Sequence, residues 1–285
     1  MKGVVGGKPS PYIGEVMKST YREKTTISGK NGQYLEVDIF PIFEKAISAV
    51  GNSRNRAQRR ATNPLQEMLN AKNCARRLAR VVNCNFDSGD LKFELTYATP
   101  NAPADEREAQ RILQNFIRRI KRFYAKHNLP EVKYITVTEI GSRTGRIHHH
   151  VIMTGGISPA DLARIWGLGY VQKIQPLQPD DKVGLVGIAN YMCGFKEGGF
   201  VDKISYRRYN ASRNLKQPKT PRPSDYKYSK KRVRQIAENE MSYEEIEKLY
   251  PEYEVAEINA IKNELFGGYY IYLRLFKPPK GKNKG

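Results

Sequence analysis

The chain has 285 residues, and its 49 lysine and arginine residues outnumber its 29 aspartate and glutamate residues, which gives a net charge of +20. A charge of this size indicates a polyanionic partner, with nucleic acid ahead of an acidic membrane surface and a merely basic soluble protein as the plain alternative. No apolar run is long enough to cross a membrane, no secretory signal opens the chain, and the three cysteines show no zinc-type pairing, so we expect a protein of the bacterial cytoplasm.

The N-terminal part of the chain carries one clear helical signal. We expect residues 1–60 to form a partly flexible extension, with little order over 1–35 and an apolar stretch at 36–50 that packs on a core. Residues 52–80 hold eight basic residues and one acid, and apolar residues recur at helical spacing in the second half of this stretch. The spacing predicts a basic amphipathic helix over 64–83.

The middle of the chain alternates between strand and helix patterns. In chain order, these patterns predict a strand over 91–98, a helix over 104–124, strands over 132–139 and 146–153, a helix over 158–166, a short strand over 169–174 and a helix around 185–193. The turn-rich residues 141–145 join two of these strands and predict an antiparallel hairpin. The apolar stripe of the helix over 104–124 predicts that this helix packs on the sheet.

The C-terminal part of the chain is divided by charge. Residues 203–234 hold twelve basic residues and one acid, with tyrosines between them, a combination suited to phosphate contact and base stacking. Residues 237–265 are acidic and helical in pattern, and the pattern of 267–276 predicts a strand. We therefore expect residues 221–285 to form a C-terminal extension with helices, a final strand and a basic tail.

Three of the four histidines are consecutive, at His148, His149 and His150. Because side chains alternate along a strand, His148 and His150 should point to one face of the sheet and His149 to the other. Two imidazoles on one face, with Glu139 at hairpin distance, can chelate one divalent metal ion. A buried, hydrogen-bonded histidine cluster and a simple ion pair between Glu139 and an arginine of the turn remain the alternatives.

Three blocks of sequence together resemble a known family. The blocks are Phe93-Glu-Leu-Thr-Tyr-Ala98, Thr138-Glu-Ile-Gly141 through Gly145-Arg-Ile-His-His-His150, and Ile188-Ala-Asn-Tyr191. In this order they resemble the rolling-circle replication initiators of the HUH endonuclease superfamily, and within it the single-tyrosine initiators of plasmids and phages. The resemblance covers residues 70–220 and implies an α+β endonuclease domain over 61–220. Its core would be an antiparallel sheet of about five strands with helices packed on one face, in ferredoxin-like or RRM-like style.

The resemblance also implies the roles of individual residues. The implied metal ligands are Glu139, His148 and His150. Tyr191 would be the nucleophile, and the family places an assisting lysine three residues after it, where this chain has Gly194 and Lys196 is the nearest lysine. Imidazole suits Mn²⁺ better than Mg²⁺, so we expect stronger binding of Mn²⁺, with Mg²⁺ as the physiological ion.

This set of residues predicts cleavage of one DNA strand at a replication origin. Attack by Tyr191 would leave a 5′-phosphotyrosyl bond and a free 3′-OH that primes a polymerase. The implied partners are single-stranded DNA, the origin duplex or hairpin and, because the chain has no nucleotide-driven motor motif, a host helicase and DNA polymerase. Charge predicts DNA contacts at Arg54, Arg56, Arg76, Arg77, Arg146, Arg207, Arg208 and Arg213. A relaxase or transposase with the same site, and a DNA-binding protein without catalysis, remain the alternatives.

Overall fold

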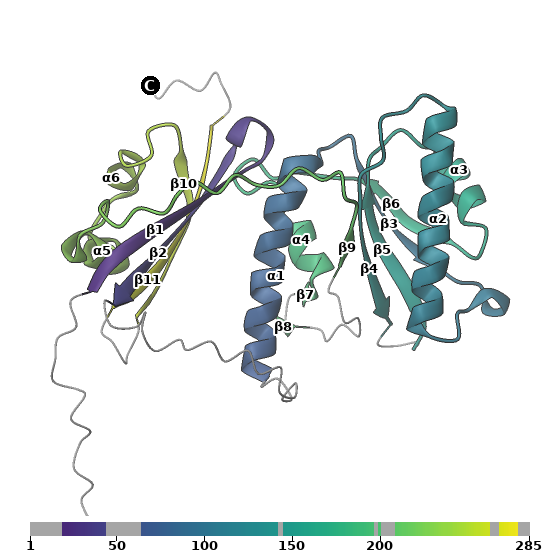
Figure 1. Cartoon of the computed structure of the whole chain (residues 1–285), viewed down its shortest axis with the longest axis horizontal. Helices are drawn as coiled ribbons and strands as arrows, with labels where there is room; N and C mark the ends of the chain where they lie inside the picture. The colour runs from purple at the N-terminus through teal and green to yellow at the C-terminus, as the bar shows by residue number, and fades with distance from the viewer. Residues whose placement is uncertain are drawn as a thin grey trace, which may run out of the picture.

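The computed structural model describes residues 19–43, 64–141, 145–196, 199–200, 209–262 and 268–278. In this part of the chain, two antiparallel sheets lie on either side of a central layer of helices, and further helices cover the outer face of each sheet (Figure 1). None of the described helices is both long enough and apolar enough to cross a membrane.

The five-stranded sheet carries the candidate site. Its strand order is β6-β3-β5-β4-β9, with β3 at Leu91–Thr96, β4 at Tyr134–Ile140, β5 at Ile147–Met153, β6 at Val171–Pro176 and β9 at Asn210–Ala211. β4 and β5 form the predicted antiparallel hairpin, which is thereby confirmed. Glu94 of β3 lies opposite His150, and Glu139 of β4 lies opposite His148. Since opposed residues of antiparallel strands share a face, these four side chains lie on one side of the sheet.

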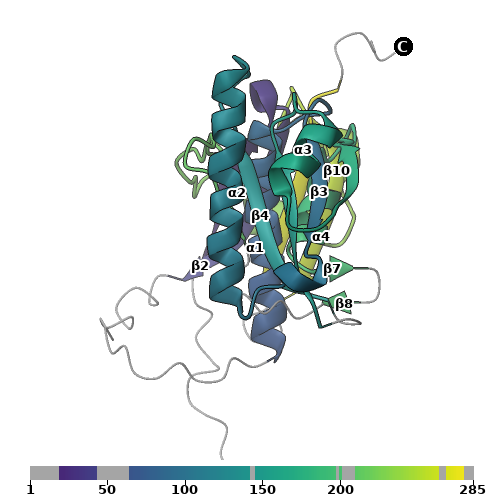
Figure 2. The same cartoon turned by 90° about the vertical axis from the view of Figure 1, so that its right-hand side faces the viewer.

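Two helices cover the other side of this sheet (Figure 2). They are α2 (Glu106–Lys126) and α3 (Pro159–Trp166). The predicted apolar stripe of α2 places Leu113, Phe116 and Ile120 in a core with residues of β3 and β5. Asp105 and Ser158 cap the two helices by accepting hydrogen bonds from backbone N–H groups of the first turn.

Two more helices pack over part of the face that carries the histidines. They are α1 (Pro64–Asn85) and α4 (Val186–Met192). Leu78 and Val82 of α1 and Ala189 of α4 form a core with Ile135 and Ile152 of the sheet. The predicted fold class is confirmed, with one addition, because helices lie on both faces of the five-stranded sheet rather than on one.

A second sheet brings the two ends of the described chain together. Its order is β1-β2-β11-β10, with β1 at Ser19–Ser28, β2 at Tyr34–Phe43, β10 at Glu254–Lys262 and β11 at Tyr269–Phe276. Its outer face is covered by α5 (Lys230–Ala237) and α6 (Tyr243–Glu247) (Figure 1). Its inner face meets α1 through ion pairs, at 2.6 Å between Arg80 and Glu36 and at 2.8 Å between Arg76 and Asp38.

The second sheet corrects two expectations about the chain ends. Little order was expected over 1–35, yet β1 pairs along its whole length with β2, a contact that its lysine- and threonine-rich composition does not reveal. Residues 237–265 were expected to be helical, yet the described ones form the short helix α6 and then strand β10. Pairing with β11 outweighs the helix-favouring composition of β10, because strand formation depends mainly on the neighbours available.

The three-part division of the chain at residues 60 and 220 stays a prediction, although the described parts of the first and third segments contribute to one sheet. The remaining described elements are β7 (Phe195–Lys196), β8 (Gly199–Phe200) and the 3₁₀ turns η1 (Lys30–Gly32) and η2 (Thr99–Asn101).

Candidate active site

Acidic and histidine side chains gather on one face of the five-stranded sheet. Along β3, Phe93 and Leu95 point into the core with α2, which leaves Glu94 on the opposite face. Along β5, the same alternation places His148 and His150 beside Glu94 and sends His149 into the core. The face therefore owes its polar character to the two-residue period of the strands.

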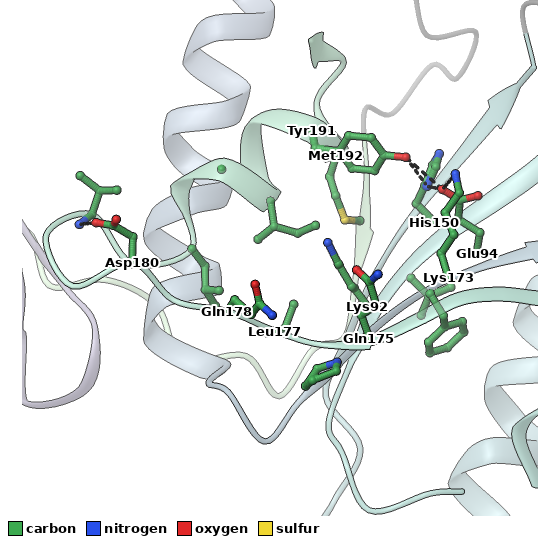
Figure 3. A pocket seen from close by; sticks show the side chains of 18 residues that line it. Lys92, Glu94, His150, Lys173, Gln175, Leu177, Gln178, Asp180, Tyr191 and Met192 are labelled. Atoms are coloured by element: carbon green, nitrogen blue, oxygen red, sulfur yellow. Dashed lines mark hydrogen bonds and ion pairs between the residues drawn. The ribbon is translucent and has the colours of Figure 1, made fainter. Parts of the chain in front are cut away.

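Helix α4 places Tyr191 against this face (Figure 3). The Tyr191 hydroxyl donates a 3.0 Å hydrogen bond to Oε1 of Glu94 and lies 3.5 Å from Nδ1 of His150. The rings of Tyr191 and His150 pack edge to face, with their centroids 5.1 Å apart. A phenol, a carboxylate and an imidazole from three separate elements thus meet at one point.

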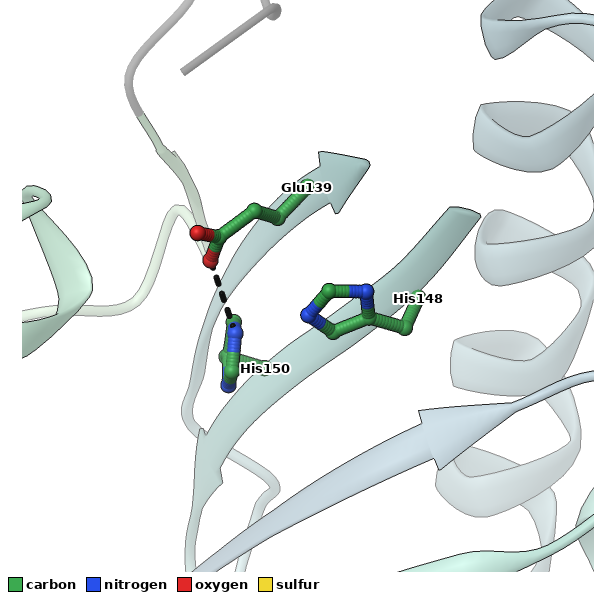
Figure 4. Close-up of side chains that lie close together, drawn as sticks. All are labelled: Glu139, His148 and His150. Carbon is green, nitrogen blue, oxygen red and sulfur yellow. Dashed lines mark hydrogen bonds and ion pairs between the residues drawn. The ribbon is translucent and has the colours of Figure 1, made fainter. Parts of the chain in front are cut away.

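The predicted metal ligands also lie together (Figure 4). Glu139, His148 and His150 each offer one ligand atom, and these atoms all lie within 4.8 Å of one another. Nε2 of His150 is 2.8 Å from Oε2 of Glu139. Glu139 and His150 are buried and His148 is partly exposed, so the cluster reaches the surface at His148. Two imidazoles and one carboxylate are a donor set that suits a divalent transition-metal ion, so these residues fit such an ion.

The middle histidine has a structural role on the opposite face. His149 is fully buried, with Nε2 2.7 Å from the Tyr97 hydroxyl and Nδ1 2.9 Å from Oγ1 of Thr138. Burial lowers the pKa of His149 to about 3, so its imidazole is neutral. The buried, hydrogen-bonded histidine that we considered as an alternative is therefore found at His149, while the two neighbouring histidines face the candidate metal site.

A fourth element brings a cation to the same carboxylate. Nζ of Lys173, in β6, lies 2.8 Å from the Glu94 oxygen that accepts the Tyr191 hydrogen bond. The register between β3 and β6 shifts between Lys92 and Glu94, and Lys173 has a left-handed backbone with φ 52°. Strand irregularities of this kind redirect a side chain, and this one directs the Lys173 ammonium toward Glu94.

Burial and neighbouring charges set the protonation of this cluster. Hydrogen bonds from His150 and then Lys173 outweigh burial and hold the pKa of Glu94 well below its usual range. Burial and then the charge of Glu94 raise the pKa of Tyr191, so its phenol stays protonated. Burial opposes the charged form of His150, but its hydrogen bonds to Glu139 and Glu94 prevail and raise its pKa. Burial and the charge of His150 lower the pKa of His148.

The other predicted site residues are not part of this cluster. Lys196 lies in β7, but its side chain falls outside the described residues. The arginines at positions predicted to contact DNA divide into Arg54, Arg56, Arg207 and Arg208, which lie outside the described residues, and Arg77, Arg146 and Arg213, which are exposed. Arg76 forms its ion pair with Asp38 and lies over the ring of Tyr272, 4.0 Å from the ring centroid.

Sequence analysis assigned no role to Glu94 or Lys173. A signal for Glu94 was present, because an acidic residue between two core residues of a strand must point to the opposite face, which here is the face of His150. Lys173 carries no comparable signal, since its position depends on a strand irregularity that the local sequence does not announce.

Comparison with known proteins covers the segment that carries this cluster. Residues 92–194 match the model of the ORF2 family of replication-associated proteins. The match includes Glu94, Glu139, His148, His150 and Tyr191. No significant match was found among curated proteins or among solved structures. Over just this segment, the chain is similar to a family of replication-associated proteins, which supports a role in the initiation of replication.

Proposed function

We propose that this protein is a rolling-circle replication initiator of the HUH type with a single catalytic tyrosine, which cuts and rejoins single-stranded DNA at an origin. One observation carries the proposal: the Tyr191 hydroxyl lies 3.5 Å from His150, whose ring also meets Glu139. A nucleophile beside a candidate metal centre is the arrangement that attack on a phosphodiester requires. The similarity to a replication-associated family supports the same assignment.

We assign the metal site to Glu139, His148 and His150, with Mn²⁺ or Mg²⁺ as the ion. When bound, such an ion withdraws charge from a non-bridging oxygen of the scissile phosphate and orients that phosphate for in-line attack. The partial exposure of His148 supports this assignment, because the substrate must reach the site from solvent.

Tyr191 acts as the nucleophile. Its oxygen forms a bond to phosphorus while the bond from phosphorus to the 3′ oxygen breaks, which leaves a 5′-phosphotyrosyl group and a 3′-OH. The phenol proton leaves along the hydrogen bond to Glu94 and ends on the 3′ oxygen, so atoms and charge balance. Because the pKa of Glu94 is held low, this carboxylate relays the proton and does not retain it. Attack by a 3′-OH on the phosphotyrosyl group reverses the step and rejoins the strand.

The remaining parts of the proposal concern the surroundings of this chemistry. We place the endonuclease domain at 61–220 and keep Lys196 as a cation that approaches the phosphate from β7. The exposed Arg77, Arg146 and Arg213 are the described residues that we assign to DNA contact. Host helicase and polymerase would unwind the origin and extend the 3′-OH.

A covalent-adduct assay tests the proposal. Wild-type protein is incubated with Mn²⁺ and labelled single-stranded DNA from its own replicon, and a denaturing gel shows whether label migrates with protein. We expect an adduct that disappears with Tyr191→Phe and with a chelator but persists with Tyr226→Phe, a change at a tyrosine that is 97% exposed. An adduct that survives Tyr191→Phe would move the nucleophile to another tyrosine. Tight DNA binding without any adduct would favour a non-catalytic DNA-binding protein.

A further inference from the structure

A cavity of about 590 Å³ opens beside Tyr191. Glu94, His150 and Tyr191 border it, whereas Glu139 and His148 do not, so it lies on the side of the tyrosine away from these two metal-ligand candidates. Its volume falls in the range of pockets that hold small organic ligands. Whatever occupies this cavity is therefore held directly next to the proposed nucleophile.

Three polar side chains that line the cavity have no partner within the described chain. Lys92, Gln175 and Gln178 make no side-chain hydrogen bond or ion pair to another described residue, and Figure 3 shows Lys92 and Gln175 extending toward α4. Lys92 and Glu94 share a face of β3, so the lysine stands two residues from the centre of the site. One cation and two amides are thus available for a ligand.

The opposite wall of the cavity is apolar. Leu177 follows β6, and Ile188 and Met192 belong to α4, where they flank Tyr191 along the helix. Leu177 and Met192 are buried. A ligand that fits has a flat or apolar face for these side chains, an edge that can exchange hydrogen bonds with amides, and a negative charge for Lys92.

We propose that this cavity binds one unpaired nucleotide of the DNA strand, immediately next to the phosphate that Tyr191 attacks. The inference rests on the proposed function and adds to it the place where the strand is read. The apolar wall takes a face of the base, Gln175 and Gln178 reach its edge, and Lys92 pairs with a backbone phosphate. The base must be unpaired, because a base stacked in a duplex cannot enter a pocket of this kind.

Gly187 provides a direct way to close the cavity. It lines the cavity from α4, and a Cβ added to it would meet no atom within 4 Å. Gly187→Phe therefore fills the space without displacing a wall. Gly89→Phe is the matched control, because a Cβ at Gly89 also meets nothing within 4 Å and Gly89 does not line the cavity.

Binding is measured with full-length Tyr191→Phe protein, so that no strand is cut. The probe is a labelled oligonucleotide that this protein selects from a random single-stranded pool, followed by a series in which one abasic site is moved along it. We expect the abasic site to weaken binding about tenfold at one position only. With Gly187→Phe added, the intact oligonucleotide should bind about tenfold more weakly and that position should cease to matter, whereas Gly89→Phe should behave as its parent.

Two amide variants and a free nucleotide complete the test. Gln175→Ala and Gln178→Ala should change which base is preferred at the sensitive position, without changing the preference elsewhere. Free deoxynucleoside monophosphates should compete poorly, because they lack the flanking strand. The inference is overturned if every position responds alike, if Gly187→Phe retains the position effect, or if a free nucleotide displaces the strand efficiently. Circular dichroism and thermal unfolding verify that each variant is folded.

The adduct assay with Tyr191 intact separates the two proposals. Position-specific binding that depends on an open cavity, without any adduct, would refute the nicking mechanism and leave the nucleotide pocket standing. An adduct that forms equally well in wild type and Gly187→Phe would refute the pocket and leave the nicking mechanism standing.

Discussion

Tyr191 and Glu94 are separated by 97 residues of chain, yet the tyrosine hydroxyl donates a 3.0 Å hydrogen bond to the glutamate. The same carboxylate oxygen lies 2.8 Å from Nζ of Lys173. Glu94 therefore holds the proposed nucleophile and a cation at one point, and its negative charge is what the two have in common.

The first prediction concerns that charge. Glu94→Gln keeps an oxygen that can accept the Tyr191 hydrogen bond but removes the ion pair with Lys173 and the capacity to relay a proton. We expect adduct formation to slow by about 100-fold. Single-turnover kinetics with labelled single-stranded DNA provide the measurement, and Glu131→Gln, at an exposed glutamate, is the control. An unchanged rate would reduce Glu94 to a structural residue.

The second prediction separates the two faces of β5. His148→Ala removes a proposed metal ligand, so Mn²⁺ affinity measured by calorimetry should fall at least about tenfold. His149→Gln should leave Mn²⁺ affinity unchanged. It should instead lower the free energy of unfolding by about 1–3 kcal/mol, because it disturbs the buried hydrogen bonds with Tyr97 and Thr138. Equal losses of Mn²⁺ affinity in both variants would contradict the assignment of the ligands.

The third prediction concerns the contact between α1 and the second sheet. The side chains of Arg80 and Glu36 are only 15% and 5% exposed, and their charged atoms lie 2.6 Å apart. Arg80→Met leaves a buried carboxylate with Arg76 as its weaker partner at 3.6 Å, so we expect a loss of about 2–4 kcal/mol in urea unfolding. The control is Arg164→Met, which breaks an exposed pair with Asp161 and should cost under about 1 kcal/mol.

The fourth prediction is a pH dependence in the second sheet. Tyr250 donates a 2.6 Å hydrogen bond to buried Glu23, and the Tyr228 hydroxyl lies 2.6 Å from that of Tyr250. Burial raises the pKa of Tyr228 well above its usual value. Its pKa in the unfolded chain is about 10. The unfolded chain therefore releases this proton first, and the stability that Tyr228 contributes is present below pH 10 and lost as the pH rises beyond it.

Tyr228→Phe tests this linkage. At pH 8 the variant should be less stable than wild type by about 1 kcal/mol, because it lacks the hydrogen bond to Tyr250. Above about pH 10 the difference should shrink by about 1.4 kcal/mol per pH unit, because the variant has no proton to lose at this position. Denaturant unfolding at pH 8, 10 and 11 measures the difference directly. A constant difference over this range would mean that Tyr228 has the same pKa in both states.

The parts of the fold that could be predicted from the sequence are those that follow from local periodicity. The apolar stripe of α2 and the alternation that separates His149 from its neighbours repeat within a few residues, so they are visible without knowledge of the fold. The hairpin of β4 and β5 joins strands that are close in sequence. The same alternation brought Glu139, His148 and His150 together as candidates before any coordinates were considered.

The parts that could not be predicted depend on contacts between distant segments. β10 has a helix-favouring composition and becomes a strand only because β11 lies beside it. Lys173 approaches Glu94 through a strand irregularity rather than through a motif. Tyr191 was singled out by resemblance alone, and its hydrogen bond to Glu94 required the packing of α4 on the sheet.

The hydrogen bonding of β2 to β11 ties completion of the second sheet to the end of protein synthesis. While the chain is being translated, β1 and β2 emerge first and must wait, with one edge of β2 unpaired, until β11 is made. All strands of the five-stranded sheet are made in between, so that sheet can form earlier. A ribosome that stalls before Tyr269 would release a chain that already holds Tyr191 and its surroundings but still exposes a free strand edge, and such a chain is prone to aggregate with others of its kind.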